Sequence, residues 1–276
     1  MLCKSALVRS GIPGVDYVIN PYTGCSHACV YCYAAFMCRF SDHSEPWGRF
    51  VDAKVNMPQV LAKEVGLGSK VRTPRRGAVM LSSVTDPYQP VEQRYLLTRA
   101  CLEVLAGAGC DLTGTPRFNV SILTKSDLVV RDIDVLQQLS AVSVGLTVTT
   151  WDDSVARLFE PGAPPPSRRF QALRCLAQAG LDTWGFFGPV LPGYSDSPKA
   201  VVELLRRFKD CGAKEVVVDK LNTYPHVMAS LERALPKRAL CPIRYCARNP
   251  RSYGDRLKVV VQEAAHLVDI PVTLEW

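Results

Sequence analysis

The sequence predicts an α/β fold built on a parallel sheet. Short apolar runs rich in β-branched residues alternate with segments of helical length, and residues suited to helix capping flank several of those segments. Strands separated by helices pair in parallel through right-handed crossovers. Because 47% of the 276 residues are hydrophobic, the chain can bury a substantial core. Six strand and helix units are fewer than the eight that close a barrel.

The expected elements follow one another along the chain. We expect strands at residues 15–20, 78–83, 119–123, 141–149, 183–191 and 215–219, and helices at residues 59–65, 93–106, 131–139, 167–179 and 198–209. Ser167 and either Asp196 or Ser197 suit helix N-caps, while Gly180 and Gly212 suit helix ends. After residue 224 we expect a small C-terminal extension, made of a basic loop, a helix near 255–267 and a strand at 271–275.

Cys25, Cys29 and Cys32 lie in the stretch NPYTGCSHACVYCYA, at the spacing C-x3-C-x2-C. Three thiolates at this spacing can hold three irons of a four-iron cluster, which normally takes four cysteines. The fourth iron stays open to a non-protein ligand, so we predict a reactive site. Two alternatives remain open: the cysteines are buried hydrophobes on one helix face, or they belong to a zinc site.

This stretch, with Tyr31 before the last cysteine, resembles the signature of the radical S-adenosylmethionine superfamily. Together with SSVTDPYQPVE at residues 82–92, it is similar to the branch related to spore photoproduct lyase. The resemblance covers roughly residues 17–224. It implies a partial, laterally open (β/α)6 TIM-like barrel at residues 1–224, with residues 225–276 as a basic extension packed on this core.

The resemblance also implies cofactors and chemistry. A [4Fe-4S] cluster would bind S-adenosylmethionine at its open iron and cleave it to a 5′-deoxyadenosyl radical, which abstracts hydrogen from a substrate. The protein's part is to position this chemistry and exclude side reactions. An electron donor such as flavodoxin or ferredoxin is the implied partner.

Polar residues follow the expected strands, where parallel α/β sheets bind ligands. A buried Lys125 needs a negative charge, and the carboxylate of S-adenosylmethionine is the expected partner. By resemblance, Thr85 and Asp86 lie near its amino group. Turn formation, a lysine at the rim and the strand preference of threonine are the alternative explanations. The residues expected at the cofactor are Tyr31, Ser83, Thr85, Asp86, Lys125, Thr147, Thr149 and Val190.

Ser83 departs from the lyase pattern. Spore photoproduct lyase returns a hydrogen atom from a cysteine near this position, and a serine O–H bond is too strong to replace it. The resemblance therefore implies a lyase-like reaction, a repair or a modification of the substrate, in which position 83 does not supply the hydrogen atom. Cys241 and Cys246 are candidate hydrogen donors, and ordinary structural cysteines are the alternative.

The net charge of +7 is concentrated near the C-terminus, which is typical of proteins with a phosphate-bearing partner. A nucleic acid is therefore the first candidate substrate, with Arg248 and Arg251 as contacts. Asp219 and Asn222 are further candidates because they follow the sixth strand. A peptide or small metabolite is the second candidate, and a non-enzymatic iron–sulfur or zinc protein the third. The basic residues are Lys237, Arg238, Arg244, Arg248, Arg251, Arg256 and Lys258.

The eleven cysteines are odd in number and scattered along the chain, unlike the disulfide framework of a small secreted domain. We see no signal peptide and no apolar run of the ~20 residues that a membrane span requires. We therefore expect a cytoplasmic protein with no membrane partner.

Overall fold

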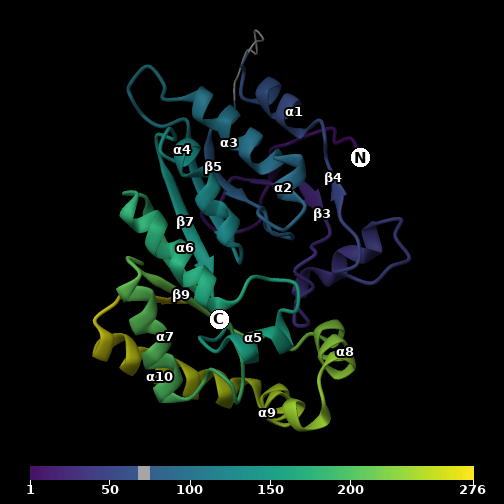
Figure 1. Ribbon diagram of the computed structural model, residues 1–276, viewed down its shortest axis with the longest axis vertical. Coiled ribbons are helices and arrows are strands. Elements are labelled where there is room, and N and C mark those ends of the chain that lie inside the picture. Colours follow the sequence, from purple (N-terminus) through teal and green to yellow (C-terminus); the bar gives the residue numbers. More distant parts are fainter. Residues whose placement is uncertain (68–74) are drawn as a thin grey trace.

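The computed structural model describes residues 1–67 and 75–276. Its centre is one sheet in the order β1-β2-β5-β6-β7-β8-β9-β10 (Figure 1). All neighbours from β2 to β10 pair in parallel, and β1 pairs antiparallel with β2. The edge strands β1 and β10 do not pair with each other, so the sheet is open. The predicted α/β class with a parallel sheet is confirmed.

The elements have the following bounds. The strands of the main sheet are β1 (Val8–Arg9), β2 (Tyr17–Ile19), β5 (Gly77–Leu81), β6 (Phe118–Thr124), β7 (Val142–Thr147), β8 (Asp182–Val190), β9 (Val216–Lys220) and β10 (Val272–Leu274), while β3 (Tyr22–Thr23) and β4 (Asp52–Ala53) form a separate antiparallel pair. The helices are η1 (Tyr33–Phe40), α1 (Met57–Glu64), α2 (Glu92–Tyr95), α3 (Leu97–Ala108), η2 (Asp127–Asp132), α4 (Ile133–Leu136), α5 (Asp153–Phe159), α6 (Pro166–Gln178), α7 (Pro198–Asp210), α8 (Pro225–Ala234), α9 (Lys237–Arg248) and α10 (Pro250–Val268), with η marking 3-10 helices.

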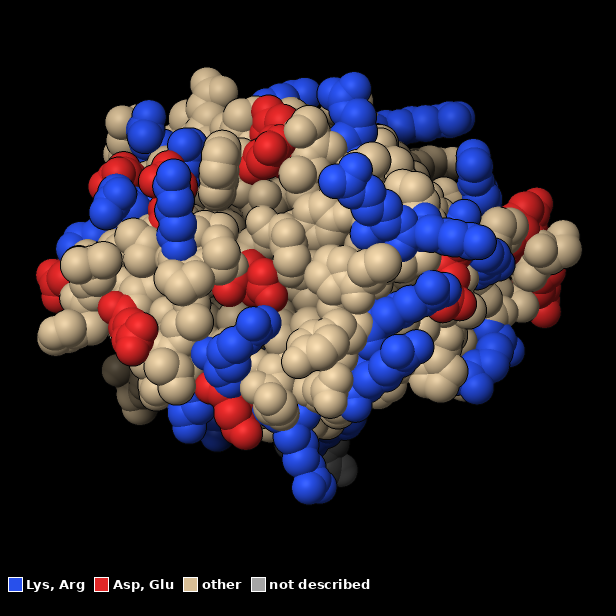
Figure 2. Space-filling view, turned by 90° about the horizontal axis from the view of Figure 1, so that it is seen from below, with Lys and Arg blue, Asp and Glu red and all other residues tan. Residues whose placement is uncertain are grey.

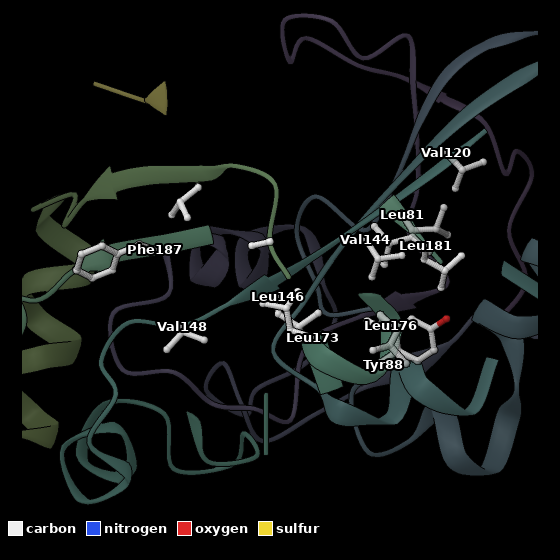
Figure 3. Close-up of a cluster of buried hydrophobic side chains, with 14 of the residues drawn as sticks. Leu81, Tyr88, Val120, Val144, Leu146, Val148, Leu173, Leu176, Leu181 and Phe187 are labelled. Atoms are coloured by element: carbon white, nitrogen blue, oxygen red, sulfur yellow. The ribbon is translucent and has the colours of Figure 1, made fainter. Parts of the chain in front are cut away.

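The core lies between the sheet and the helices packed on it. Residues along β6 alternate between buried and more exposed positions, so one face of this strand points into the core. Figure 3 shows Leu81, Val120 and Val144 from neighbouring strands near Leu176 of α6, within one buried cluster. Burying such a side chain fully stabilises the fold by about 1.5–3 kcal/mol.

Two expected elements differ from the structure. The helix expected at 131–139 is confirmed only in part, because the α-helix is limited to the single turn α4 and the 3-10 helix η2 precedes it. The expected basic loop is helical, because α8 and α9 occupy most of it. Pro250 stands in the first turn of α10, where a helix tolerates proline. Pro242 lies inside α9, which is stabilised by burial of Leu240, Ile243 and Cys246 on one face.

The C-terminal elements are integrated with the rest of the molecule. β10 extends the sheet by pairing with β9, and α10 packs against α7. Helices α8 and α9 join a second buried cluster that contains Tyr31, Leu221, Val227 and Leu240. Within residues 1–67 and 75–276, no helix has the length and apolar character needed to cross a membrane.

Candidate functional site

The three motif cysteines lie in irregular turns between β3 and η1, so they do not form a helix face. Burial raises the pKa of all three thiols, to about 12 for Cys25, and each thiol lies within electrostatic reach of another. Backbone N–H groups oppose this effect: His27 and Asp86 donate to Cys25, and the residues after Cys32 donate to its sulfur. Such donors favour the thiolate, which is the form that binds metal.

The placement of the possible metal ligands distinguishes a site for a single ion from a site for a cluster. Among the described residues, no three His, Cys, Asp or Glu side chains are placed to hold a single ion. In a four-iron cluster each thiolate binds a different iron, so its ligands stand farther apart than those of one zinc ion.

Gln89 holds the backbone of the loop that carries Cys25, Cys29 and Cys32, here called the cysteine loop. This fully buried side chain accepts a hydrogen bond from Ser26 N at 2.9 Å and donates to Gly24 O at 3.2 Å. It also donates to Thr85 Oγ1 at 2.9 Å, and Thr85 in turn donates to Gly24 O at 2.5 Å. The segment after β5 thus holds the backbone on which Cys25 stands.

Asp86 joins the cysteine loop to two strands. Its Oδ1 accepts from Thr124 Oγ1 at 2.6 Å and from Tyr88 N at 2.9 Å. Its Oδ2 accepts from Lys125 N at 2.8 Å and lies 3.3 Å from His27 Nδ1. Burial opposes its charge, but His27 and these hydrogen bonds outweigh burial and lower the pKa to about 2. Both carboxylate oxygens of Asp86 are therefore engaged inside the protein.

Tyr31 belongs to a buried charged cluster. Its hydroxyl donates to Glu160 Oε1, which also accepts from Thr149 Oγ1 at 3.3 Å. Arg169 Nη2 lies 2.5 Å from Glu160 Oε2, and neither side chain is exposed. Arg169 also donates to Thr147 O at 3.1 Å. Tyr31 is thus held by Glu160, which is paired with Arg169 of α6. The hydrogen bond from Arg169 to Thr147 O joins this cluster to the end of β7.

The loop between α5 and α6 lies against the cysteine loop. Gly162 N donates to His27 O at 3.0 Å, and Val30 N donates to Phe159 O at 2.9 Å. A Cβ on Gly162 would stand 2.2 Å from Ser26 O, so no larger residue fits without displacing the backbone. This contact is a second one, besides that of Gln89, that fixes the middle of the cysteine motif.

Lys125 places a cation beside the cysteines. Its Nζ lies 5.8 Å from the centre of the Tyr31 ring, and its charge lowers the pKa of Cys29 and Cys32 against the larger effect of burial. The side chain is half-buried. An anionic ligand at the cysteine loop would therefore meet a positive charge that burial has partly removed from water.

Other expected residues occupy the same end of the sheet. Ser83 N donates to Asn20 Oδ1 at 3.0 Å, and Ser83 O accepts from the Tyr33 hydroxyl. Asp219, at the end of β9, has its pKa raised to about 6 by burial and by Glu275, and it lies within electrostatic reach of Tyr33. The buried Thr147 and Val190 end β7 and β8, while Asn222 is exposed just after β9.

Four expected residues lie on the C-terminal helices. Arg248 and Arg251 are exposed where α9 meets α10. Cys241 is exposed on α9, whereas Cys246 is buried and burial raises its pKa to about 11. None of these four side chains forms a hydrogen bond or ion pair with the cysteine loop in the described structure.

Sequence reasoning missed several residues that shape the site. Gln89 lies inside the quoted stretch 82–92 but was not singled out, and the buried pairing of Glu160 with Arg169 has no local sequence signal. Trp47 is a further omission: its indole nitrogen is buried without a hydrogen-bond partner in the described residues, although it lies near Cys32. Three thiols, donors that favour thiolates, an unpaired buried N–H and a nearby lysine fit an iron–sulfur cluster with an anionic ligand.

Comparisons with known proteins agree with this chemistry. The sequence model of the radical SAM superfamily matches residues 19–218. The chain is 36% identical to the uncharacterized protein MJ0683 of Methanocaldococcus jannaschii over 194 residues, or 70% of this chain and 67% of that protein. It is 35% identical to the uncharacterized protein Rv2578c of Mycobacterium tuberculosis over 251 residues, or 86% of this chain and 70% of that protein.

Solved structures share the fold. Spore photoproduct lyase complexed with dinucleoside spore photoproduct has a TM-score of 0.70 and 15% identity, covering 100% of this chain and 80% of the lyase chain. SuiB of Streptococcus suis bound to S-adenosylmethionine has a TM-score of 0.58 and 14% identity, covering 94% of this chain and 50% of SuiB. At these identities the likeness establishes a common architecture.

Proposed function

Because this chain belongs to the radical SAM superfamily, and is therefore a radical SAM enzyme, we propose that Cys25, Cys29 and Cys32 hold a [4Fe-4S] cluster. Bound there, the cluster would supply the electron that splits S-adenosylmethionine into methionine and a 5′-deoxyadenosyl radical. That radical would abstract hydrogen from the substrate. The observation that carries this proposal is the set of three adjacent thiols, buried at Cys25 and partly buried at Cys29 and Cys32, beside the Lys125 cation.

The remaining residues have proposed roles in binding the cofactor. Lys125 meets the carboxylate of S-adenosylmethionine, because it is a half-buried cation whose charge reaches Cys29 and Cys32. Thr85 and Asp86 shape the loop that receives the amino group, since their own polar atoms are engaged with the cysteine loop and β6. The other members of the proposed cofactor site lie on the same end of the sheet and are Tyr31, Ser83, Thr147, Thr149 and Val190.

We infer further that the open sheet is the curved (β/α)6 partial barrel of this superfamily, with residues 225–276 as its extension. The likeness to spore photoproduct lyase over the whole chain supports this architecture. A parallel barrel brings the ends of its strands to one mouth, where Lys125 and Asp219 would face a common space. A flavodoxin or ferredoxin is the proposed electron donor.

Anaerobic reconstitution tests the reaction. Protein loaded with iron and sulfide, then reduced with dithionite, should convert S-adenosylmethionine into 5′-deoxyadenosine. Replacing Cys25, Cys29 or Cys32 by Ala should abolish both the cluster absorbance and the product, whereas Cys110→Ala, at an exposed cysteine, should change neither. A full cluster in all three motif variants would refute the ligand assignment.

We propose a nucleic acid as the substrate. Five exposed cations on α9 and α10 form no ion pair with any described residue, and Figure 2 shows Lys and Arg side chains gathered over part of the face that carries these helices. Phosphates are their natural partners. One structural neighbour is complexed with a dinucleoside photoproduct, which agrees with this class. The five cations are Lys237, Arg238, Arg248, Arg251 and Lys258.

A peptide is the second candidate, because another structural neighbour, SuiB, is bound to a precursor peptide. Deuterium transfer separates the two classes. With uniformly deuterated DNA or RNA, 5′-deoxyadenosine should gain deuterium if a nucleic acid is the substrate. Gain of deuterium only from a deuterated peptide pool would favour the second candidate. Asp219 and Asn222 are proposed substrate contacts, and the exposed Cys241 is the more accessible of the two proposed hydrogen donors, the other being Cys246.

A further inference from the structure

The segment from residue 41 to residue 50 folds over the cysteine loop. Gly48 packs so closely on Ala28 that an added Cβ would stand 2.6 Å from the Ala28 Cβ. Phe50, at the end of the segment, is buried. Backbone contact at this distance leaves no room for a larger residue at position 48. The segment therefore packs against the cysteine stretch at two points, Gly48 on Ala28 and Phe50 on Gly24.

Trp47 is held in this cover by aromatic packing. Its ring meets Phe50 edge to face, with 6.1 Å between centroids, and Phe50 stacks on His43 at 4.1 Å. His43 Nε2 lies 2.9 Å from Asp52 Oδ2, which ties the stack to β4. The indole is thus positioned by neighbours that have no part in the cysteine motif.

The indole N–H of Trp47 lacks an acceptor. Its nitrogen is buried and has no hydrogen-bond partner in the described residues, a state that costs free energy and needs a physical reason. The Cys32 sulfur is close by: burial raises the pKa of this thiol, and the Trp47 indole is among the donors that lower it again. Gly48, next to Trp47, packs on Ala28, and Phe50 packs on Gly24, so the unpaired N–H belongs to a segment that lies against the cysteine stretch.

We propose that Trp47 is a positioning residue for the cluster, and that its N–H donates a hydrogen bond to the Cys32 sulfur once that sulfur binds iron. A thiolate is a stronger acceptor than a thiol, so metal binding would satisfy the unpaired donor. Reduction adds negative charge to a cluster, and a hydrogen bond to its sulfur stabilises that charge. Trp47 thus raises the reduction potential. This inference rests on the proposed cluster at Cys25, Cys29 and Cys32.

Isotope labelling tests the contact in the unsubstituted protein. Tryptophan labelled with 15N in the indole ring should give a weak 15N coupling to the reduced cluster in pulsed electron paramagnetic resonance. The coupling should persist in Trp276→Phe, whose ring lies by Lys220 and Gly254, and vanish in Trp47→Phe. Absence of any coupling in the labelled wild type would overturn the proposal.

A redox titration tests the proposed effect of Trp47 on the reduction potential of the cluster. Trp47→Phe keeps an aromatic ring against Phe50 but removes the N–H, so its midpoint potential should shift to more negative values. Trp276→Phe should titrate like the wild type. An unchanged potential in a Trp47→Phe protein with full iron content would also overturn the inference. If that variant loses its cluster, the labelled wild type decides.

Different results would refute the proposed function and the proposed role of Trp47. A wild-type protein that assembles no four-iron cluster would remove the proposed function and this inference together. A cluster that cleaves S-adenosylmethionine but shows no 15N coupling would remove only the role of Trp47.

Discussion

Glu160 and Arg169 form an ion pair that has no exposure to solvent. Removing one member of such a pair leaves an uncompensated buried charge, which typically costs about 3–5 kcal/mol. We expect Arg169→Met to lower the free energy of unfolding of the metal-free protein by that amount in urea titrations. The double variant Glu160→Gln/Arg169→Met should recover part of the loss. A loss under about 1 kcal/mol in the single variant would contradict the buried pairing.

The ionised Asp219 side chain lowers the free energy of unfolding, and this effect depends on pH. Its pKa in the folded protein is about 6, raised from 3.8 by burial and by Glu275. The folded chain therefore keeps a proton that the unfolded chain loses, and stability falls as pH rises from about 4 to about 6. Asp219→Asn should raise the free energy of unfolding at pH 7.5 by about 1–3 kcal/mol.

The gain from Asp219→Asn should shrink toward pH 4, where the carboxyl group is protonated in both states. Urea unfolding at several pH values measures it, with Asp255→Asn at an exposed position as the control. If both variants show the same pH profile as the wild type, then Asp219 is not desolvated in the folded protein.

Single residues were the least predictable part of the site. The spacing of Cys25, Cys29 and Cys32 is a local pattern, so the sequence alone singled them out. The partners of Glu160 are not local: Arg169 lies nine residues along the chain, and Tyr31 comes from another element. Such a cluster forms only when α6 packs beside the end of β7, and propensities carry no information about that contact.

The cysteine loop depends on the segment between β5 and α2. Gln89 bonds to both Gly24 O and Ser26 N, so Gln89→Leu would leave the partly buried Ser26 N without its partner and Gly24 O with only the hydrogen bond from Thr85. We expect this variant to fold but to bind less than half of the wild-type iron after reconstitution. Gln93→Leu, at an exposed position in α2, is the matched control. Equal iron content in the two variants would show that these hydrogen bonds are dispensable.

Strands of the central sheet were predictable because their signal is strong and local. The expected runs at 119–123 and 215–219 overlap β6 and β9, where apolar β-branched residues cluster. The two-residue strands β3 and β4 carry no such signal, and their pairing depends on contacts across the chain. Helix α9 was expected to be part of a basic loop, but burial of Leu240, Ile243 and Cys246 on one face stabilises a helix there despite Pro242.

At the scale of the whole molecule, the composition predicts an excess of basic residues but not where they lie on the surface. The excess of basic residues predicted a phosphate-bearing partner, but only the structure distributes these charges. Arg244 lies 2.8 Å from Glu232, and Arg256 lies 3.5 Å from Asp196, so both are partly neutralised. The cations without ion pairs in the described structure include Arg248 and Arg251, where α9 meets α10.

Reversing these two charges tests the proposed nucleic-acid surface. Arg248→Glu/Arg251→Glu should weaken binding to DNA or RNA and flatten its salt dependence, by roughly 0.9 in the slope of log K against log salt for each lost duplex phosphate contact. Filter binding at several salt concentrations measures both effects. Cleavage of S-adenosylmethionine without substrate should be unchanged, because neither arginine forms a hydrogen bond or ion pair with the described cysteine loop.

The control for this variant carries the same change in charge at another place. Arg76→Glu/Lys214→Glu alters exposed residues just before β5 and β9. These residues lie at the amino ends of the two strands, opposite their carboxyl ends. If the effect depends on position, this control should bind nucleic acid more tightly than Arg248→Glu/Arg251→Glu. Equal losses in the two variants would mean that net charge alone governs binding. Absence of salt-sensitive binding in the wild type would leave a peptide or small metabolite as the remaining substrate class.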